Sequence, residues 1–118
     1  MASDIPATSA QDQRAREFTD ELYAGYRFLV RSIGYRAKSF LEMVTLHGGV
    51  GAAQLLLRGS HTHDGFTRLW EERMLEYSVE AVVLKPRYES LFTEHERDVA
   101  RDRLIRHEFD VDAYLTQL

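Results

Sequence analysis

The chain has 118 residues and no cysteine, so disulfides and thiolate metal sites are excluded. Hydrophobic residues make up 44% of it and charged residues 29%, which is typical of a globular protein rather than a disordered one. The formal net charge is −4, and the excess of acidic over basic residues is located after residue 70. This balance argues against a surface that wraps nucleic acid over its whole extent, because phosphate binding needs a basic footprint.

Residues 1–12 predict a disordered leader, because they are small and polar and show no apolar period. They lack the basic segment and apolar run of a signal peptide, and no apolar stretch approaches the ~20 residues that a membrane span needs. We therefore expect a cytoplasmic protein with a single helical domain over residues 13–118 and no membrane partner.

A first helix is predicted from about Gln13, where apolar residues recur at spacings of three and four: Phe18, Leu22, Tyr26, Leu29 and Ile33. Gly34 is expected to end it. Phe28 lies on the side away from most of these residues. It either covers a second helix or marks an interface.

Two short apolar helices are predicted next, over residues 39–47 (SFLEMVTLH) and 50–57 (VGAAQLLL). The pair Gly48-Gly49 between them supplies a tight turn, with a left-handed cap for the first helix. Ala52 and Ala53 allow a neighbour to approach closely. The segment has a helix-turn-helix shape.

The second half of the chain predicts several more short helices. Residues 60–65 (SHTHDG) form a loop, and a helix carrying Phe66, Leu69 and Trp70 follows, with Asp64 or Thr67 as its cap. Ser78 begins a short helix that ends at Lys85-Pro86.

Thr93 and Glu96 then match a capping box, which predicts a helix to about His107. The tail predicts one more short helix with Asp110 or Asp112 near its start. The fold class is therefore all-α, a compact orthogonal bundle of five to seven mostly short helices. The expected core residues are Phe66, Leu69, Trp70, Val79, Val82, Val83, Leu91 and Phe92.

One long spaced pattern runs through residues 33–104, with GGVxAAxxLL followed by GFTxLWExxxLxxxVExxVLxPxYxxLFTxxExxxARxRL. It includes Gly48, Gly49, Trp70, Glu80 and Arg103. This pattern resembles an uncharacterised bacterial all-helical domain that is found alone or appended to larger proteins. No function is established for such domains, so the resemblance implies an accessory or interaction role and nothing more specific.

A protein interface is the first functional hypothesis. Arg27, Arg31 and Tyr35 surround Phe28, and exposed aromatic residues beside arginines are enriched in protein interfaces. The partner would be another protein or a second copy of the chain, as a homodimer.

Nucleic-acid binding is the alternative hypothesis. Gly49-Val50-Gly51 is similar to the hairpin of helix-hairpin-helix domains, whose backbone N–H groups bind a phosphate. Two features depart from that pattern: Leu55 stands where a small residue is expected, and the second helix has one cation. The candidate contacts are Arg27, Arg31, Arg36, Lys38, Gly49, Gly51, Gln54 and Arg58.

Catalysis and metal binding find little support in the sequence. His61, His63 and Asp64 share a loop, but no fixed third ligand position accompanies them, so a solvated loop is favoured over a metal site. Acidic pairs such as Glu71-Glu72 have no nucleophile or phosphate loop beside them. We predict no enzyme activity, no catalytic residue, no metal and no cofactor. Because Glu76 and Glu80 lie one turn apart with like charge, we also expect a cationic partner near them, either internal or external.

Overall fold

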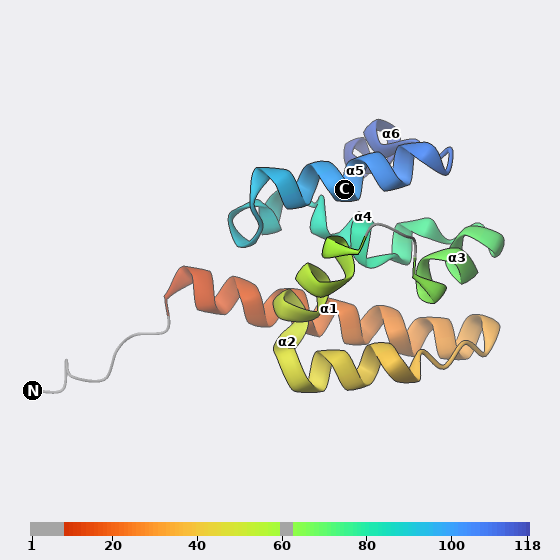
Figure 1. The fold of residues 1–118 in the computed structure, drawn as a ribbon, viewed down its shortest axis with the longest axis horizontal. Coiled ribbons are helices and arrows are strands. Elements are labelled where there is room, and N and C mark those ends of the chain that lie inside the picture. Colours follow the sequence, from red (N-terminus) through yellow and green to blue (C-terminus); the bar gives the residue numbers. More distant parts are fainter. Residues whose placement is uncertain (1–8, 60–62) are drawn as a thin grey trace, which may run out of the picture.

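The computed structural model describes residues 9–59 and 63–118, and within these ranges it contains six α-helices, two 3₁₀-helices and no strand (Figure 1). The all-α prediction is therefore confirmed, and six α-helices fall within the predicted range. The elements are α1 (Ala10–Ile33), α2 (Lys38–Arg58), α3 (Asp64–Glu71), η2 (Leu75–Tyr77), α4 (Val79–Val83), η3 (Pro86–Leu91), α5 (Glu94–Arg106) and α6 (Val111–Thr116).

The first helix starts earlier than the sequence predicted. Of the predicted leader, residues 1–8 lie outside the described residues, but residues 10–12 already belong to α1. The cause is local: the hydroxyl of Ser9 accepts a hydrogen bond from the backbone N–H of Asp12 at 2.9 Å and caps the helix. At the other end, Gly34 takes a left-handed conformation with φ 67° and ends α1 as predicted.

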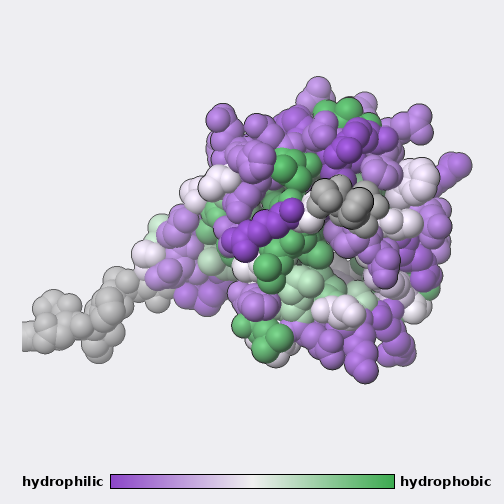
Figure 2. Space-filling model, in the orientation of Figure 1, coloured by the Kyte–Doolittle hydropathy of each residue, from purple (hydrophilic) through white to green (hydrophobic). Residues whose placement is uncertain are grey.

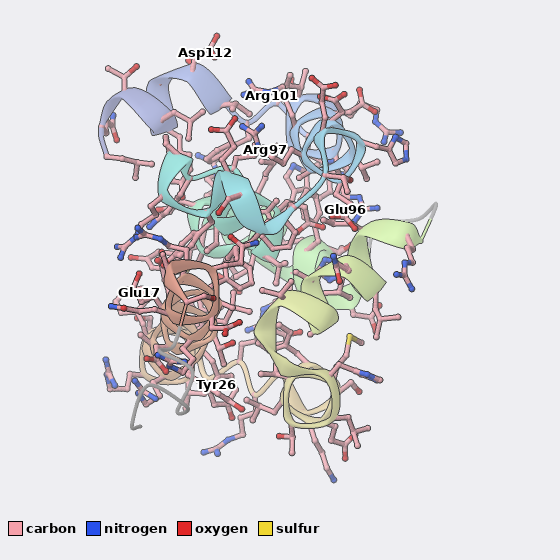
Figure 3. The ribbon with its side chains drawn as sticks, turned by 90° about the vertical axis from the view of Figure 1, so that its left-hand side faces the viewer. Glu17, Tyr26, Glu96, Arg97, Arg101 and Asp112 are labelled. Carbon is pink, nitrogen blue, oxygen red and sulfur yellow. The ribbon has the colours of Figure 1, made fainter. Side chains whose placement is uncertain are left out.

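The helices lie in three tiers. In Figure 1, α1 and the first half of α2 form the lower tier, α3 and α4 the middle one, and α5 and α6 the upper one. The second half of α2 rises from the lower tier into the middle one, and the end-on view of Figure 3 agrees. In the upper tier, Arg101 of α5 and Asp112 of α6 lie close together, with 3.7 Å between their charged atoms. The short α4 is buried between the outer tiers, so its side chains meet both.

The predicted glycine turn is a kink within α2. Gly48 has φ 76° and ψ 169°, a conformation that is essentially restricted to glycine, and helical geometry resumes directly after it. Gly49 is buried against α1, because a Cβ atom there would lie 2.8 Å from the Cα of Thr19. The two short helices of the sequence prediction therefore exist on either side of Gly48, and in Figure 1 the first lies beside α1 while the second turns away from it toward α4.

Helix caps fix the start of each later helix. Ser78, Thr93 and Asp110 cap α4, α5 and α6 as predicted, and the reciprocal capping box of Thr93 and Glu96 is complete. The prediction for α3 was wrong. His63, rather than Asp64 or Thr67, is its cap, because its ring nitrogen accepts the N–H of Phe66 at 3.1 Å.

One apolar cluster joins the tiers. All the expected core residues belong to it except Trp70, which is 46% exposed and therefore contradicts the prediction. Phe66 and Leu69 already fill the buried side of the short α3, so Trp70 turns outward and rests edge-on against His107. Phe18 of α1 contacts Tyr88 and Phe92 in edge-on geometry, which packs the first helix across the core as expected.

Candidate functional site

The outer face of α2 leaves apolar side chains in solvent. Leu46 is 77% exposed and Leu55 is 39% exposed, although Val44, Ala52 and Ala53 on the inner face are buried. Figure 2 shows apolar surface across the centre of one face, over the position that α2 takes in Figure 1, with hydrophilic residues around it. Apolar residues that gather on one face, rather than being scattered singly, are typical of interaction sites.

By length and composition α2 is also the one helix in the described ranges that could cross a membrane, which the sequence reading did not expect. Its most apolar window has a mean hydropathy of 1.3, and 28% of that window is buried within the fold. The kink at Gly48 interrupts the helix near its middle.

The hairpin that contains this face also carries cations without ion pairs. We define the basic hairpin as residues 22–58, which contain five Lys or Arg residues and, as the single acid, Glu42. Within the described chain none of the five forms an ion pair, whereas every other Lys and Arg except Arg16 and Arg73 does. The five are Arg27, Arg31, Arg36, Lys38 and Arg58.

The predicted interface residues divide into two kinds. Arg27 and Arg31 are exposed and one turn apart on α1, so they are open to a partner. Phe28 is half-buried and stacks on Tyr77 with 4.7 Å between ring centroids, so it covers η2, as one of the two sequence alternatives expected. Tyr35 is half-buried under the guanidinium of Arg68, which lies 5.3 Å from its ring centre.

The predicted nucleic-acid residues are not brought together as a set. Arg36 and Lys38 lie in or beside the loop before α2, and Arg58 is at its opposite end. The N–H of Gly49 donates to the hydroxyl of Thr19 at 3.0 Å, so it is not available to a phosphate. Gly51 and Gln54 are half-buried. Arg36 and Lys38 therefore remain as candidate contacts to nucleic acid, whereas the N–H of Gly49 is no longer a candidate phosphate donor.

A cavity of about 480 Å³ opens between the basic hairpin and the segment from α3 to α4. Its volume falls within the range of small-molecule sites. Most of its lining is apolar, from Leu22, Leu29, Phe40, Met43, Leu56, Leu69 and Val79. Its polar lining includes Arg36 and Lys38, together with Tyr26 of α1, which Figure 3 labels.

A buried ionic network shares His63 with the lining of this cavity. Glu80 of α4 is fully buried, and its Oε2 lies 2.7 Å from Nη1 of Arg103 and 2.9 Å from Nε2 of His63. Arg103 also donates to the carbonyl oxygens of Leu56 and Gly59 at 3.3 and 2.8 Å. One glutamate thus joins α3, α4, α5 and the C-terminal end of α2.

The hydrogen bonds of His63 fix its tautomer. Nδ1 accepts the N–H of Phe66, so in the neutral ring Nε2 carries the proton and donates it to Glu80. Neither nitrogen remains for a substrate proton or a metal ion. His61, the other histidine of the predicted loop, lies outside the described residues. Within the described ranges no three His, Cys, Asp or Glu side chains are grouped to hold a metal ion.

Electrostatics keep Glu80 charged. Burial by itself would raise the pKa of its carboxyl, but the hydrogen bonds from His63 and Arg103 stabilise the carboxylate and hold that pKa below its usual value. Its second oxygen, Oε1, has no hydrogen-bond partner among the described atoms. Arg103 is therefore the internal cationic partner that the sequence led us to expect near Glu80.

Comparison with known protein families, with curated proteins and with solved structures found no match to this chain. The functional surfaces must therefore be judged on their own chemistry. Sequence reasoning found the cations of the basic hairpin but missed the exposed face of α2, the cavity and the role of His63. A signal for the exposed face was present, because nearly every residue of 50–57 is apolar or small and one face of a helix cannot bury them all.

Proposed function

We propose that this chain is a non-catalytic cytoplasmic interaction module whose basic hairpin binds a partner protein through an apolar and acidic segment. A single observation carries the proposal: the exposed leucines of α2 and five cations without ion pairs belong to the same helical hairpin. An amphipathic acidic helix would cover both, with its apolar side on Leu46 and Leu55 and its carboxylates near Arg27 and Arg31.

Charge favours a different protein over a second copy. A two-fold contact between two basic hairpins places the same surface patch of both copies face to face. Arg27 and Arg31 of one copy would then approach cations of the other, with Glu42 as the single acid of each hairpin to offset them. Like charges brought together at an interface cost free energy. An acidic partner gains from the same cations.

Nucleic acid remains the alternative, and the cations without ion pairs favour it as well. The exposed face of α2 weighs against it, because leucine side chains gain nothing from a phosphate backbone. Gly49, the residue that suggested phosphate binding, uses its N–H within the fold. The two readings differ in salt dependence, which is steep when several phosphates are neutralised.

Site-specific crosslinking tests the proposal directly. A photoreactive amino acid replaces Leu46 in one variant and Ile105 in another, and each protein is irradiated in extract from its own source organism. Ile105 is a matched control, because it is 54% exposed and lies on α5, away from the basic hairpin. We expect one acidic protein to crosslink from position 46 and not from position 105.

The charge requirement supplies the second condition. Arg27→Gln and Arg31→Gln are combined with the photoreactive amino acid at position 46. The yield of the crosslink from position 46 should fall about tenfold or more, since each close charge pair across an interface contributes more than about 1 kcal/mol. Equal crosslinking from both positions would contradict the proposal. A molar mass in light scattering that rises only with added DNA or RNA at low salt would also contradict the proposal and support nucleic-acid binding. A dimer that forms without a partner would contradict it as well.

A further inference from the structure

The cavity beside the basic hairpin combines an apolar interior with two cations. We propose that it binds a small amphipathic carboxylate, with an acyl chain in the cavity and the carboxylate held by Arg36 and Lys38. The proposal goes beyond the partner-binding function, because Leu46, Leu55, Arg27 and Arg31 do not line this cavity.

The interior matches an acyl chain. Its lining comes from both halves of the molecule: Leu22 and Leu29 from α1, Phe40 and Met43 from α2, and Leu69 and Val79 from the elements opposite. Such side chains offer dispersion contacts and no hydrogen bonds, so a ligand that fills the space must be apolar along most of its length. A volume of about 480 Å³ accommodates a chain of moderate length.

The polar lining favours an anionic head group. Arg36 and Lys38 are exposed, line the cavity and form no ion pair in the described chain. A carboxylate between them gains charge-assisted hydrogen bonds that no residue of this chain supplies. Asp64 is the single carboxylate of the lining, so the two cations outnumber it.

Hydroxyl groups complete the polar lining. Tyr26 and Tyr35 both line the cavity. Burial raises the pKa of Tyr35, and the charge of Asp64 raises it further, so its phenol stays protonated and donates. His63 also lines the cavity, but both of its ring nitrogens are already hydrogen-bonded. Tyr77 and Ser39 add two more hydroxyls to the lining, whereas the hydroxyl of Ser78 already donates to the carbonyl oxygen of Leu75. The donors that line the cavity are therefore two cations and several hydroxyls, a set that suits an acceptor-only head group.

Three ligands of one length test the hydrocarbon chain and the head group separately. Decanoate, decanol and decylamine each have ten carbons and differ in the charge of the head group, and each is titrated into the full-length protein by calorimetry. We expect decanoate to bind, decanol to bind with an affinity at least about tenfold lower, and decylamine not to bind. A charge-assisted hydrogen bond contributes at least about a factor of ten to the affinity. Equal affinity for decanoate and decanol would refute the carboxylate assignment.

Methyl NMR locates the ligand. Of the two methionines in the described residues, Met43 lines the cavity and Met74 does not. Decanoate should shift the methyl signal of Met43 and leave that of Met74 unchanged. A shift of Met74 alone, or of neither, would place the ligand elsewhere and overturn the proposal.

Two kinds of variant separate the cations from the cavity. Arg36→Gln with Lys38→Gln changes only exposed side chains and should weaken decanoate at least tenfold while decanol is unaffected. Arg16→Gln is the matched control, because Arg16 is also exposed and without an ion pair but does not line this cavity, and it should leave decanoate affinity unchanged. Met43→Trp fills the cavity and should abolish binding of both ligands. Unchanged affinity in the double variant would overturn the proposal even if the tryptophan variant fails to fold.

Discussion

The basic hairpin and the segment from Ser78 to His107 use charged residues in opposite ways. In the second region Glu80 and Arg103 are buried and bonded to each other, and four elements meet at the pair. In the basic hairpin the cations are exposed and form no ion pair. A buried ion pair specifies how helices pack, because separating the two side chains leaves a buried charge without a partner and without hydration. An exposed unpaired cation adds little to stability and stays available for a partner.

Apolar residues follow the same division. Tyr88, Leu84 and Leu104 of the second region are among the largest fully buried side chains, whereas Leu46 of the hairpin is largely in solvent. The hairpin joins the core through α1 and through Gly49, Ala52 and Ala53, and the outer side of α2 is left free. The second region therefore holds most of the largest fully buried side chains, although its Ile105 is 54% exposed, and the hairpin carries the exposed leucines of α2.

The largest expected effect comes from opening the buried ionic pair. Arg103→Met should lower the free energy of unfolding by about 3–5 kcal/mol, because it leaves Glu80 buried without its cation. Urea unfolding followed by circular dichroism measures it. Arg106→Met is the matched control on the same helix, since its pair with Asp102 is more than 60% exposed on both sides and should be worth less than about 1 kcal/mol. Equal losses in the two variants would abolish the contrast between buried and exposed pairs.

Lowering the pH should reduce the stability contributed by the same ionic network, by less than Arg103→Met does. The folded pKa of Glu80 lies below its usual value of 4.5, so the stability that it contributes is present above that value and is lost as pH falls through the folded pKa. Protonation leaves a neutral carboxyl that can still hydrogen-bond, so the loss should be smaller than in Arg103→Met. The free energy of unfolding, measured from pH 7 to pH 3, should decline less steeply in Glu80→Gln than in the parent chain. Parallel curves would show that Glu80 does not titrate with folding.

A pair of glycine variants tests where the hairpin is fixed to the core. Gly49→Ala should destabilise the protein by about 1–3 kcal/mol, because its Cβ would lie 2.8 Å from the Cα of Thr19 and α1 would have to shift. Gly25→Ala within α1 meets nothing within 4 Å and should stabilise by about 0.5–1 kcal/mol through helix propensity. Thermal unfolding of both variants gives the sign. A tolerated Gly49→Ala would mean that the two helices are not in close contact there.

Patterns local in sequence were predicted well, because their physics is local. The caps at Ser78, Thr93 and Asp110, the end of α1 at Gly34 and the break at Gly48 each depend on residues within one turn. The core positions of Phe66 and Val82 followed from helical spacing. Such information is available before any tertiary contact is known.

Contacts between distant residues could not be predicted in the same way. Arg103 and Glu80 are 23 positions apart, and each resembles an ordinary charge on a helix until the tiers are assembled. Trp70 is expected in the core because it follows Phe66 and Leu69 at helical spacing, yet the short α3 buries only the face that carries those two residues. The cavity depends on segments from Leu22 to Val79, so no spacing rule along one helix indicates it.

The smallest expected effect concerns the outer face of α2. Leu46→Ala should change the free energy of unfolding by less than about 0.5 kcal/mol, because Leu46 is 77% exposed. Val44→Ala, two positions away on the buried side, should cost more than about 1 kcal/mol. Chemical denaturation at two protein concentrations measures both. If Leu46→Ala costs as much as Val44→Ala and the parent midpoint rises with concentration, α2 is covered by a second copy, because only association makes stability concentration-dependent. A small, concentration-independent effect leaves the leucine free for the acidic partner, and its exposure is then a feature that binding rather than folding explains.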